Sequence, residues 1–364
     1  MKKWKKILII ISSIVLTISI AGGLTAYFLL LHHYKGKTVV NNWNKEDEFR
    51  IENIKVVEKK KDKDFVILNF ADIQMCDLDD IPNMRIIHDE LNEIVDKVKP
   101  DLITLTGDQT WSNENLISLT TLVRWLDKYQ IPYAPVFGNH DYGNEYNIAV
   151  ASVNKCCDIY EKGKYSLFDR GPTNIGTLGN YVINIKEEDK IIKTLYMMDS
   201  GYLDKITDEQ IEWFKWNAEG IKAKNNNKYS EGIVYLHKPL PEYYDAYRAY
   251  LNGDPSVEKI NDMTVSYSLR GSEQNGFFDI AKERGVTDVV CGHQHGNNFT
   301  LKYQGVRLTF AVKTDQLVGY YDDGTTNLNG ATYLQVNKDE TTVHNYYVPS
   351  GKYHITDDGN VAKR

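Results

Sequence analysis

The sequence has few cysteines, no internal repeat, no low-complexity linker and no excess of basic residues. Its four cysteines in 364 residues do not form a disulfide framework, and buried thiols that act as small apolar side chains account for them. Without repeats, the chain is not a solenoid or a propeller of short units. The formal net charge of -7 provides no basic field to hold a long polyanion, so no nucleic-acid partner is expected.

One long uncharged run lies near the N-terminus. Lysines crowd the first six positions, and residues 7–31 then carry no charge. A bilayer core needs about 20 apolar residues, so this run is long enough to span it. The lysine-rich end predicts a cytoplasmic tail, with the rest of a single-pass cell-membrane protein outside the cytoplasm. The alternative is a cleaved signal peptide and a secreted protein, with Ser19 and Ala21 at the cleavage site. We favour the anchor because the apolar run continues past Ala21.

Short runs rich in Val, Ile, Leu and aromatic residues predict buried strands at 64–70, 101–106, 131–137, 232–236 and 287–291. Polar motifs follow these strands in a fixed order: Asp72-Ile73-Gln74, Gly107-Asp108, Gly138-Asn139-His140-Asp141, His237 and Gly292-His293-Gln294-His295. Ligand sites of α/β folds lie at the carboxyl edge of the sheet. We therefore expect these side chains to meet at one edge.

Helical spacing of apolar residues predicts helices at 83–98 and 115–129, which gives the order β-α-β-α-β. An antiparallel pair at 180–185 and 191–198, a helix at 208–222 and a strand-rich region beyond His295 follow. This order favours two packed sheets covered by helices. The expected divisions are a cytoplasmic tail (1–6), an anchor (7–31), a stalk with a first strand (38–63), the main domain (64–350) and a C-terminal tail (351–364).

The ordered motifs are typical of a two-metal site. Two divalent cations can clamp a phosphoryl group, hold a bridging hydroxide as nucleophile and stabilise the leaving oxygen. Such a site needs one anionic bridge, and Asp108 at a strand end can offer one oxygen to each metal. His293 and His295, two residues apart on an extended or turn backbone, can point at neighbouring ions, and Gly292 permits the tight exit from the strand.

The motifs differ in specificity when taken singly. Asp-x-Gln and Gly-Asp are weak signals, because an Asp at a strand end is usually a solvated loop residue or a helix cap. A lone His237 is compatible with a structural histidine. Gly-His-x-His is the most specific of the set. The whole series in this order is what argues for a metal centre.

The series resembles the calcineurin-like metallophosphoesterase superfamily over roughly 64–348, and residues 136–141 and 237–243 resemble its purple-acid-phosphatase-like branch. The resemblance implies a four-layer α-β-β-α sandwich. It also implies that Asp72, Asp108 and His295 hold a first metal, with Gln74 where many members have His, and that Asp108, Asn139, His237 and His293 hold a second. His140 would then stabilise the transition state or protonate the leaving group, oriented by Asp141.

The chain departs from the family pattern at Gln74. A neutral amide oxygen replaces an imidazole there, so the first site is expected to bind more weakly and to prefer harder ions. Manganese, iron, zinc and magnesium all remain candidates. A long segment at 252–276 carries Arg270, and we expect this loop, with Lys238 or Arg270 as phosphate contacts, to select the substrate.

These observations predict a dinuclear metal-dependent phosphoester hydrolase that acts on a small phosphate ester, with phosphomonoesters favoured by the branch resemblance. A phosphodiesterase acting on a nucleotide or lipid-derived diester uses the same clamp and is the first alternative. A non-catalytic metal-binding scaffold is the second, with Gln74 as its only support.

Trp111 generates a spectroscopic prediction. It stands three residues after Asp108, where purple acid phosphatases carry a tyrosine ligand, and an indole cannot ligate a metal. We expect the metal-loaded protein to be colourless, as measured by its visible absorption spectrum. A purple charge-transfer band would contradict this expectation.

Overall fold

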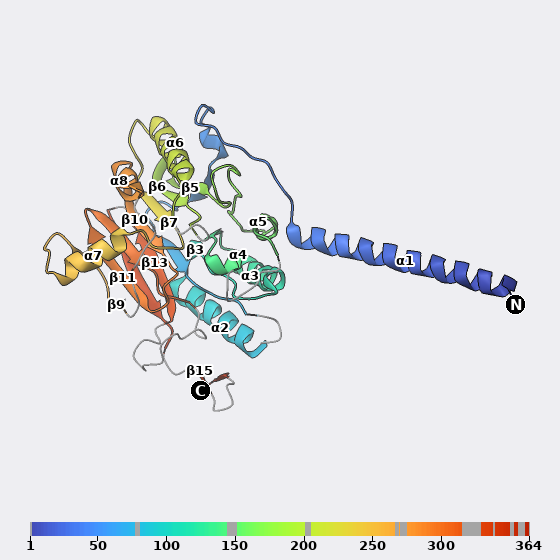
Figure 1. Ribbon diagram of the computed structural model, residues 1–364. Coiled ribbons are helices and arrows are strands. Elements are labelled where there is room, and N and C mark those ends of the chain that lie inside the picture. The colour runs from blue at the N-terminus through green and yellow to red at the C-terminus, as the bar shows by residue number, and fades with distance from the viewer. Residues whose placement is uncertain are drawn as a thin grey trace.

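Two mixed β-sheets lie between helices in the computed structural model, and one long helix projects away from them (Figure 1). The structure describes residues 2–76, 81–143, 151–200, 205–265, 269, 275–314, 329–337, 339–349, 353–355 and 361–363. The chain is thus an α/β protein, as its pattern of strands and helices predicts.

The larger sheet has the strand order β1-β5-β6-β7-β10-β12-β11-β8, with β9 paired to β11. Its strands are β1 (Lys55–Glu58), β5 (Tyr181–Glu187), β6 (Lys190–Met197), β7 (Gly232–Tyr235), β8 (Glu258–Lys259), β9 (Thr264–Val265), β10 (Val286–Cys291), β11 (Asn297–Tyr303) and β12 (Val306–Phe310). The smaller sheet has the order β14-β13-β2-β3-β4. Its strands are β2 (Phe65–Phe70), β3 (Leu102–Thr106), β4 (Tyr133–Val136), β13 (Gly330–Val336) and β14 (Thr341–Tyr347). A separate hairpin joins β15 (Tyr353–Ile355) and β16 (Val361–Lys363).

Helices cover the outer faces of both sheets (Figure 1). Besides α1, the helices in the described residues are α2 (Ile81–Val98), α3 (Asn115–Tyr129), α4 (Asn139–Tyr142), α5 (Val153–Tyr160), α6 (Asp208–Lys224), α7 (Glu242–Leu251) and α8 (Phe277–Glu283), with a short 3-10 turn at Ile51–Asn53. Helix α6 begins at a capping box, in which Thr207 Oγ1 accepts from the Gln210 N–H and Gln210 Oε1 accepts from the Thr207 N–H. The predicted helices at 83–98, 115–129 and 208–222 match α2, α3 and α6 closely.

The core divides according to the alternation of side chains along the strands. In β6, Leu195 and Met197 join the core that the two sheets and α2 share, whereas Tyr196 joins the core beneath α6. This period of two is the signature of a strand buried on both faces. The layers therefore run helices, sheet, sheet, helices.

Parallel pairing brings the carboxyl ends of six strands to one edge. In the smaller sheet β2, β3 and β4 run parallel, and in the larger sheet β6, β7 and β10 do so. The register aligns their last residues, for example Thr106 with Val136 and Met197 with Tyr235. The loops that follow these strands therefore emerge side by side.

The long helix α1 (Lys2–Lys35) covers the segment predicted to be a membrane anchor. In the described part of the chain, no helix combines the length and the apolar character needed to cross a membrane. The predicted transmembrane anchor at 7–31 is therefore not supported by the structure.

The segment between α1 and β2 lies along the domain. Asn41 Nδ2 donates to the Gly171 carbonyl, the Phe49 and Trp216 rings meet edge to face at 5.2 Å, and β1 pairs with β5. Gly220 on α6 leaves room for this contact, because a Cβ there would lie 2.2 Å from the Phe49 ring. We call residues 36–58 the N-terminal strap.

The contact between Phe49 and Gly220 predicts that the effect of Gly220→Ala on stability reverses when Phe49 is removed. Gly220→Ala should destabilise the protein by about 1–3 kcal/mol in urea unfolding, because the Phe49 ring must move. In a Phe49→Ala background the same substitution should stabilise it by roughly 0.5–1 kcal/mol, the usual gain of Ala over Gly in a helix. Equal destabilisation in both backgrounds would show that the strap does not pack here.

Candidate metal centre

The loops after β2, β3, β7 and β10 bring the predicted ligands together at the shared carboxyl edge. Two groups of side chains are placed so that, within each group, the ligand atoms lie within 4.8 Å of one another: Asp108, His237 and His293 form one group, and Asp72, Asp108 and His295 form the other. Asp108 belongs to both groups. A carboxylate common to two ligand sets is the arrangement that a bridging ligand requires.

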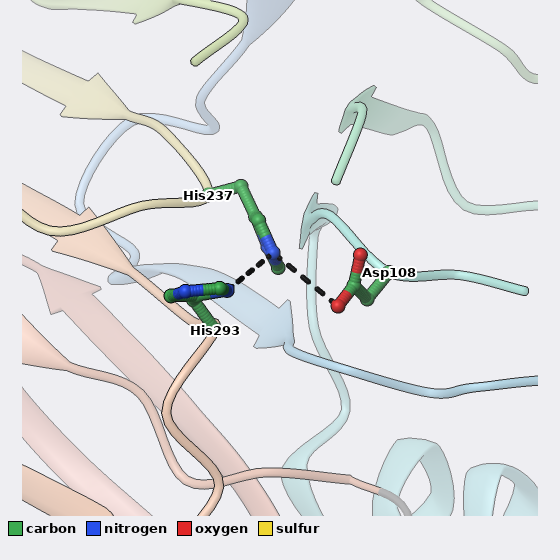
Figure 2. A group of neighbouring side chains, drawn as sticks. All are labelled: Asp108, His237 and His293. Carbon is green, nitrogen blue, oxygen red and sulfur yellow. Dashed lines mark hydrogen bonds and ion pairs between the residues drawn. The ribbon is translucent and has the colours of Figure 1, made fainter. Parts of the chain in front are cut away.

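The first group joins three strands from both sheets. Figure 2 shows Asp108, His237 and His293 pointing toward one another. The Nε2 atom of His237 lies 3.3 Å from Asp108 Oδ2 and 3.1 Å from His293 Nδ1. It also lies 3.0 Å from Asn139 Oδ1, so the predicted amide ligand is part of the same group.

The other nitrogen of His237 fixes its orientation. Nδ1 lies 2.8 Å from the carbonyl oxygen of Thr106, the last residue of β3. A carbonyl only accepts, so Nδ1 carries a proton and donates, and the lone pair of Nε2 in the neutral ring faces the other ligands. This hydrogen bond also joins the two sheets.

The second group, Asp72, Asp108 and His295, has Gln74 beside it. His295 Nε2 lies 3.5 Å from Asp72 Oδ1 and 3.2 Å from Gln74 Nε2. The two ends of an amide exchange places by a half turn, so the Gln74 oxygen can occupy the same position. As it stands, Gln74 Oε1 is buried and has no hydrogen-bond partner among the described residues.

Four predicted ligand residues adopt a left-handed backbone: Asp72 (φ 52), Gln74 (φ 49), Asp108 (φ 48) and His293 (φ 76). Each such residue costs on the order of 1 kcal/mol, and strain of this kind persists only where surrounding contacts hold it. Here the His293 N–H donates to both oxygens of Asp72, at 3.1 and 3.0 Å. Bonds from the Gln74 N–H to the Asp108 carbonyl and from the Met75 N–H to the Gln109 carbonyl, both 2.9 Å long, tie the loops after β2 and β3 together.

Three glycines in the motifs leave room for the ligands. A Cβ on Gly107 would lie 2.4 Å from His237 Nδ1, one on Gly138 would lie 2.2 Å from Asp108 Oδ1, and one on Gly292 would lie 2.5 Å from Asp72 Oδ2. All three distances are far below van der Waals contact. Each glycine is therefore required by the ligand of a neighbouring loop.

The charges of the centre are mutually dependent. Burial acts to raise the pKa of Asp108, but His237, His140 and His293 outweigh it and hold the pKa well below its usual range. Burial acts to lower the pKa of His237, yet the charge of Asp108 and the hydrogen bond to it raise the pKa to about 9. Burial, followed by the neighbouring His237, lowers the pKa of His293. Without a metal, the Asp108 carboxylate thus favours a protonated His237, and a bound cation would take the place of that proton.

His140 lies beside Asp108 on the short helix α4. Its backbone N–H donates to Asp108 Oδ1 at 2.8 Å, and its Nε2 lies 3.8 Å from Asp108 Oδ2. The Trp111 ring packs against its imidazole, with centroids 5.1 Å apart and planes inclined at 31°. The indole that replaces a tyrosine ligand is therefore a neighbour of the predicted acid.

Asp141 holds the loop that carries Asp108. Its carboxylate accepts from the backbone N–H groups of Gln109 at 3.3 Å, Thr110 at 3.0 Å and Gly138 at 2.9 Å. Burial and then the charge of Asp108 raise the pKa of Asp141 to about 7, while the Gly138 and Thr110 N–H groups act to lower it. These contacts make Asp141 a positioning residue for the Asp108 loop.

Asp199 was not among the predicted site residues. It follows β6, as Asp72 follows β2 and Asp108 follows β3. Its buried carboxylate accepts a hydrogen bond from the Tyr142 hydroxyl on α4. Lys238 is half-buried, and burial lowers its pKa, while the charges of Asp108 and Asp199 act to raise it. Lys238 therefore lies within the field of both acids. Arg270, the other predicted phosphate contact, lies outside the described residues.

The donor set fits divalent metal ions. Carboxylate, imidazole and amide groups are the ligands of manganese, iron, zinc and magnesium. Within the described residues, Gln74 Oε1 is a buried acceptor without a hydrogen-bond partner, and acceptor atoms of Asn139 and Asp108 face the lone-pair side of His237. A cation satisfies such converging acceptors, which otherwise repel one another.

Comparison with known proteins points to the same kind of centre. A family model described as calcineurin-like phosphoesterase matches residues 65–297. The chain is 25% identical over 257 residues to "Probable inactive purple acid phosphatase 14" of Arabidopsis thaliana, a match that covers 61% of this chain and 60% of that protein. It is 26% identical over 231 residues to "Phosphatase DCR2" of Saccharomyces cerevisiae, which covers 58% of this chain and 39% of that protein. The chain thus matches only part of the length of these relatives.

A solved structure shows a weaker likeness. Purple acid phosphatase PPD1 from yellow lupin seeds superposes with a TM-score of 0.47 at 12% identity, covering 83% of this chain and 53% of that chain. This similarity is too low to support an argument about the site.

The close approach of Gly107 to His237 generates a prediction about metal binding. Gly107→Ala should weaken the binding of manganese at least tenfold in a calorimetric titration, because the new Cβ pushes the His237 ring out of place. Gly253→Ala is the matched control, since Gly253 also has a positive φ (74°) but has nothing within 4 Å of its Cβ position. If both variants lose metal equally, backbone strain rather than the His237 contact is responsible.

Proposed function

Because the chain belongs to the calcineurin-like phosphoesterase family, we propose that it is a dinuclear metal-dependent hydrolase of phosphate esters, with small phosphomonoesters as its substrates. The observation that carries this proposal is the position of Asp108, whose carboxylate belongs to both groups of metal-binding side chains. Two adjacent cations that share a carboxylate ligand can stabilise both the attacking and the leaving oxygen of a phosphoryl transfer.

The residues divide into two ligand sets. Asp72, Asp108, His295 and Gln74 would hold one divalent ion, and Asp108, Asn139, His237 and His293 the other. When bound, such ions supply Lewis acidity to the phosphoryl oxygens and lower the pKa of a water molecule. The hydrogen bond from His237 Nδ1 to the Thr106 carbonyl fixes the orientation of this imidazole and would leave Nε2 free to hold an ion.

His140 is proposed to donate a proton to the leaving oxygen. Its imidazole lies next to Asp108 without belonging to either ligand group, and packing against Trp111 restricts its rotation. General acid catalysis of this kind contributes about 10²–10⁴-fold. Asp141 acts indirectly, because its carboxylate holds the loop of Asp108.

Lys238 is proposed to contact the phosphoryl group. It follows His237 directly, and its backbone N–H donates to Ser200 Oγ at 3.1 Å, which fixes the chain at this point. A half-buried ammonium group beside the acids of the centre attracts a phosphate dianion more strongly than an exposed lysine does. The preference for monoesters rests on the resemblance to the purple-acid-phosphatase-like branch.

Two other functions are compatible with this fold. A phosphodiesterase needs the same pair of ions, and the nature of the second ester group decides between the two activities. A non-catalytic scaffold is favoured by one observation, namely that a relative is named "Probable inactive purple acid phosphatase 14". Asp108 and His140, the two residues on which hydrolysis most depends, are both present in this chain. Location at the cell membrane stays a prediction from the sequence.

Hydrolysis of p-nitrophenyl phosphate and of bis-p-nitrophenyl phosphate by the metal-stripped and reloaded full chain tests the proposal. We expect turnover that depends on manganese, iron or zinc and is higher with the monoester. Asp108→Ala should abolish both metal binding and turnover, because it removes the shared ligand. His140→Ala should bind metal normally and lose about 10²–10⁴-fold in kcat.

Lys302→Ala on β11 is the control for nonspecific effects, because Lys302 lies on a strand outside both ligand groups. Higher turnover with the diester would assign the protein as a phosphodiesterase. A folded protein that binds two metal ions per chain but hydrolyses neither ester would favour the scaffold.

A further inference from the structure

A second concave surface lies between α3, α5 and the end of α1, and none of the residues that line it belongs to the metal centre. Its cavity encloses about 540 Å³. Leu116, Val123 and Ile159 form an apolar floor, and Arg124, Lys155 and Lys162 surround it. We call this surface the α3–α5 groove.

The groove carries an excess of positive charge. No ion pair involves Arg124, Lys155 or Lys162 in the part of the chain that the structure describes. The one acid that lines the groove is Asp127, and its carboxylate is occupied by other donors. Asp127 Oδ1 accepts from the Tyr133 hydroxyl at 3.2 Å and from the Tyr165 N–H at 3.1 Å, and Oδ2 accepts from the Lys164 N–H at 3.0 Å. The three cations are therefore available to an anionic ligand.

The groove is continuous with α1. His33 in the last turn of α1 lines it, and Ser152, next to α5, ties α1 to the domain. The Ser152 N–H donates to the Tyr34 carbonyl at 3.0 Å, and Ser152 Oγ donates to the Lys35 carbonyl at 2.6 Å. From this junction α1 projects away from the domain (Figure 1). Apolar side chains along it are exposed, among them Leu16 at 61% and Leu29 at 66%.

We propose that the α3–α5 groove binds the headgroup of an anionic phospholipid at a lipid surface, with the start of an acyl chain on its apolar floor. Cations around an apolar floor match the chemistry of an amphiphile, in which a phosphate adjoins a hydrocarbon chain. A nucleic acid duplex keeps its base faces stacked inside and offers no hydrocarbon chain to the floor. The exposed apolar side chains of α1, whose last turn lines the same groove, contact the same lipid.

This proposal is independent of phosphate-ester hydrolysis, because none of the groove residues belongs to either ligand group. The groove would hold the protein at a lipid surface whether or not the metal centre is active.

Flotation of the full chain with vesicles tests the proposal. The probes are vesicles of phosphatidylcholine alone and of phosphatidylcholine with phosphatidylglycerol. A lysine or arginine near an anionic surface contributes about 1 kcal/mol, which is about fivefold in partitioning. The triple variant Arg124→Gln/Lys155→Gln/Lys162→Gln should therefore lose on the order of a hundredfold in partitioning to the anionic vesicles. Its binding to neutral vesicles should not change.

The matched control is Lys97→Gln/Lys190→Gln/Lys228→Gln, which removes the same charge at positions outside the groove. An equal loss in both triple variants would overturn the proposal, since net charge alone would then explain the binding. Displacement of the wild-type protein from anionic vesicles by free glycerol phosphate would also overturn it and indicate a simple phosphate site. Tighter binding of polyglutamate than of vesicles, lost in the groove variant, would replace the lipid with an acidic peptide. Circular dichroism spectra and urea unfolding midpoints equal to those of the wild-type protein show that both triple variants are folded.

Discussion

The placement of one buried carboxylate, that of Asp108, governs the architecture of the centre. The residue lies in a left-handed conformation after β3, and four separate contacts keep it there: the His140 N–H, the loop bonds of Asp141, the pairing with the Gln74 loop and the close approach of Gly138. Each is weak alone. Together they hold a charge at a position where the backbone is strained and where solvation by water has been lost.

The two sheets contribute unequally to this arrangement. The smaller sheet supplies the acids Asp72 and Asp108, and the larger supplies the imidazoles of His237 and His293. Opposite types of ligand therefore face one another across the contact between the sheets. Packing of the sheets and assembly of the centre depend on each other, because the His237 ring donates to Thr106 across that contact. Metal binding would accordingly stabilise the contact between the sheets.

The positions at which strands end are the feature of this fold that the sequence predicts most directly. Apolar runs followed at once by Asp, Asn or His predict both the strands and the edge at which their polar residues meet, and the structure brings those residues together. The roles of the individual residues stay predictions. Long-range contacts are harder to predict: nothing local in Gly107 or Gly138 indicates that a side chain from another loop occupies the space beside it. For the same reason, the bonds of Asp141 and the partner of Asp199 emerge only from the folded arrangement.

The N-terminal strap has a consequence for where the folded unit begins. Strand β1 pairs along β5 and completes the border of the larger sheet, and Lys59, at its end, pairs with Glu187. Without β1, β5 would be an edge strand with a row of unpaired N–H and C=O groups. Such edge strands pair readily with strands of other molecules. The folded unit thus extends beyond residues 65–297, which match its family. A protein shortened to that match would be prone to self-association for a reason unrelated to its chemistry.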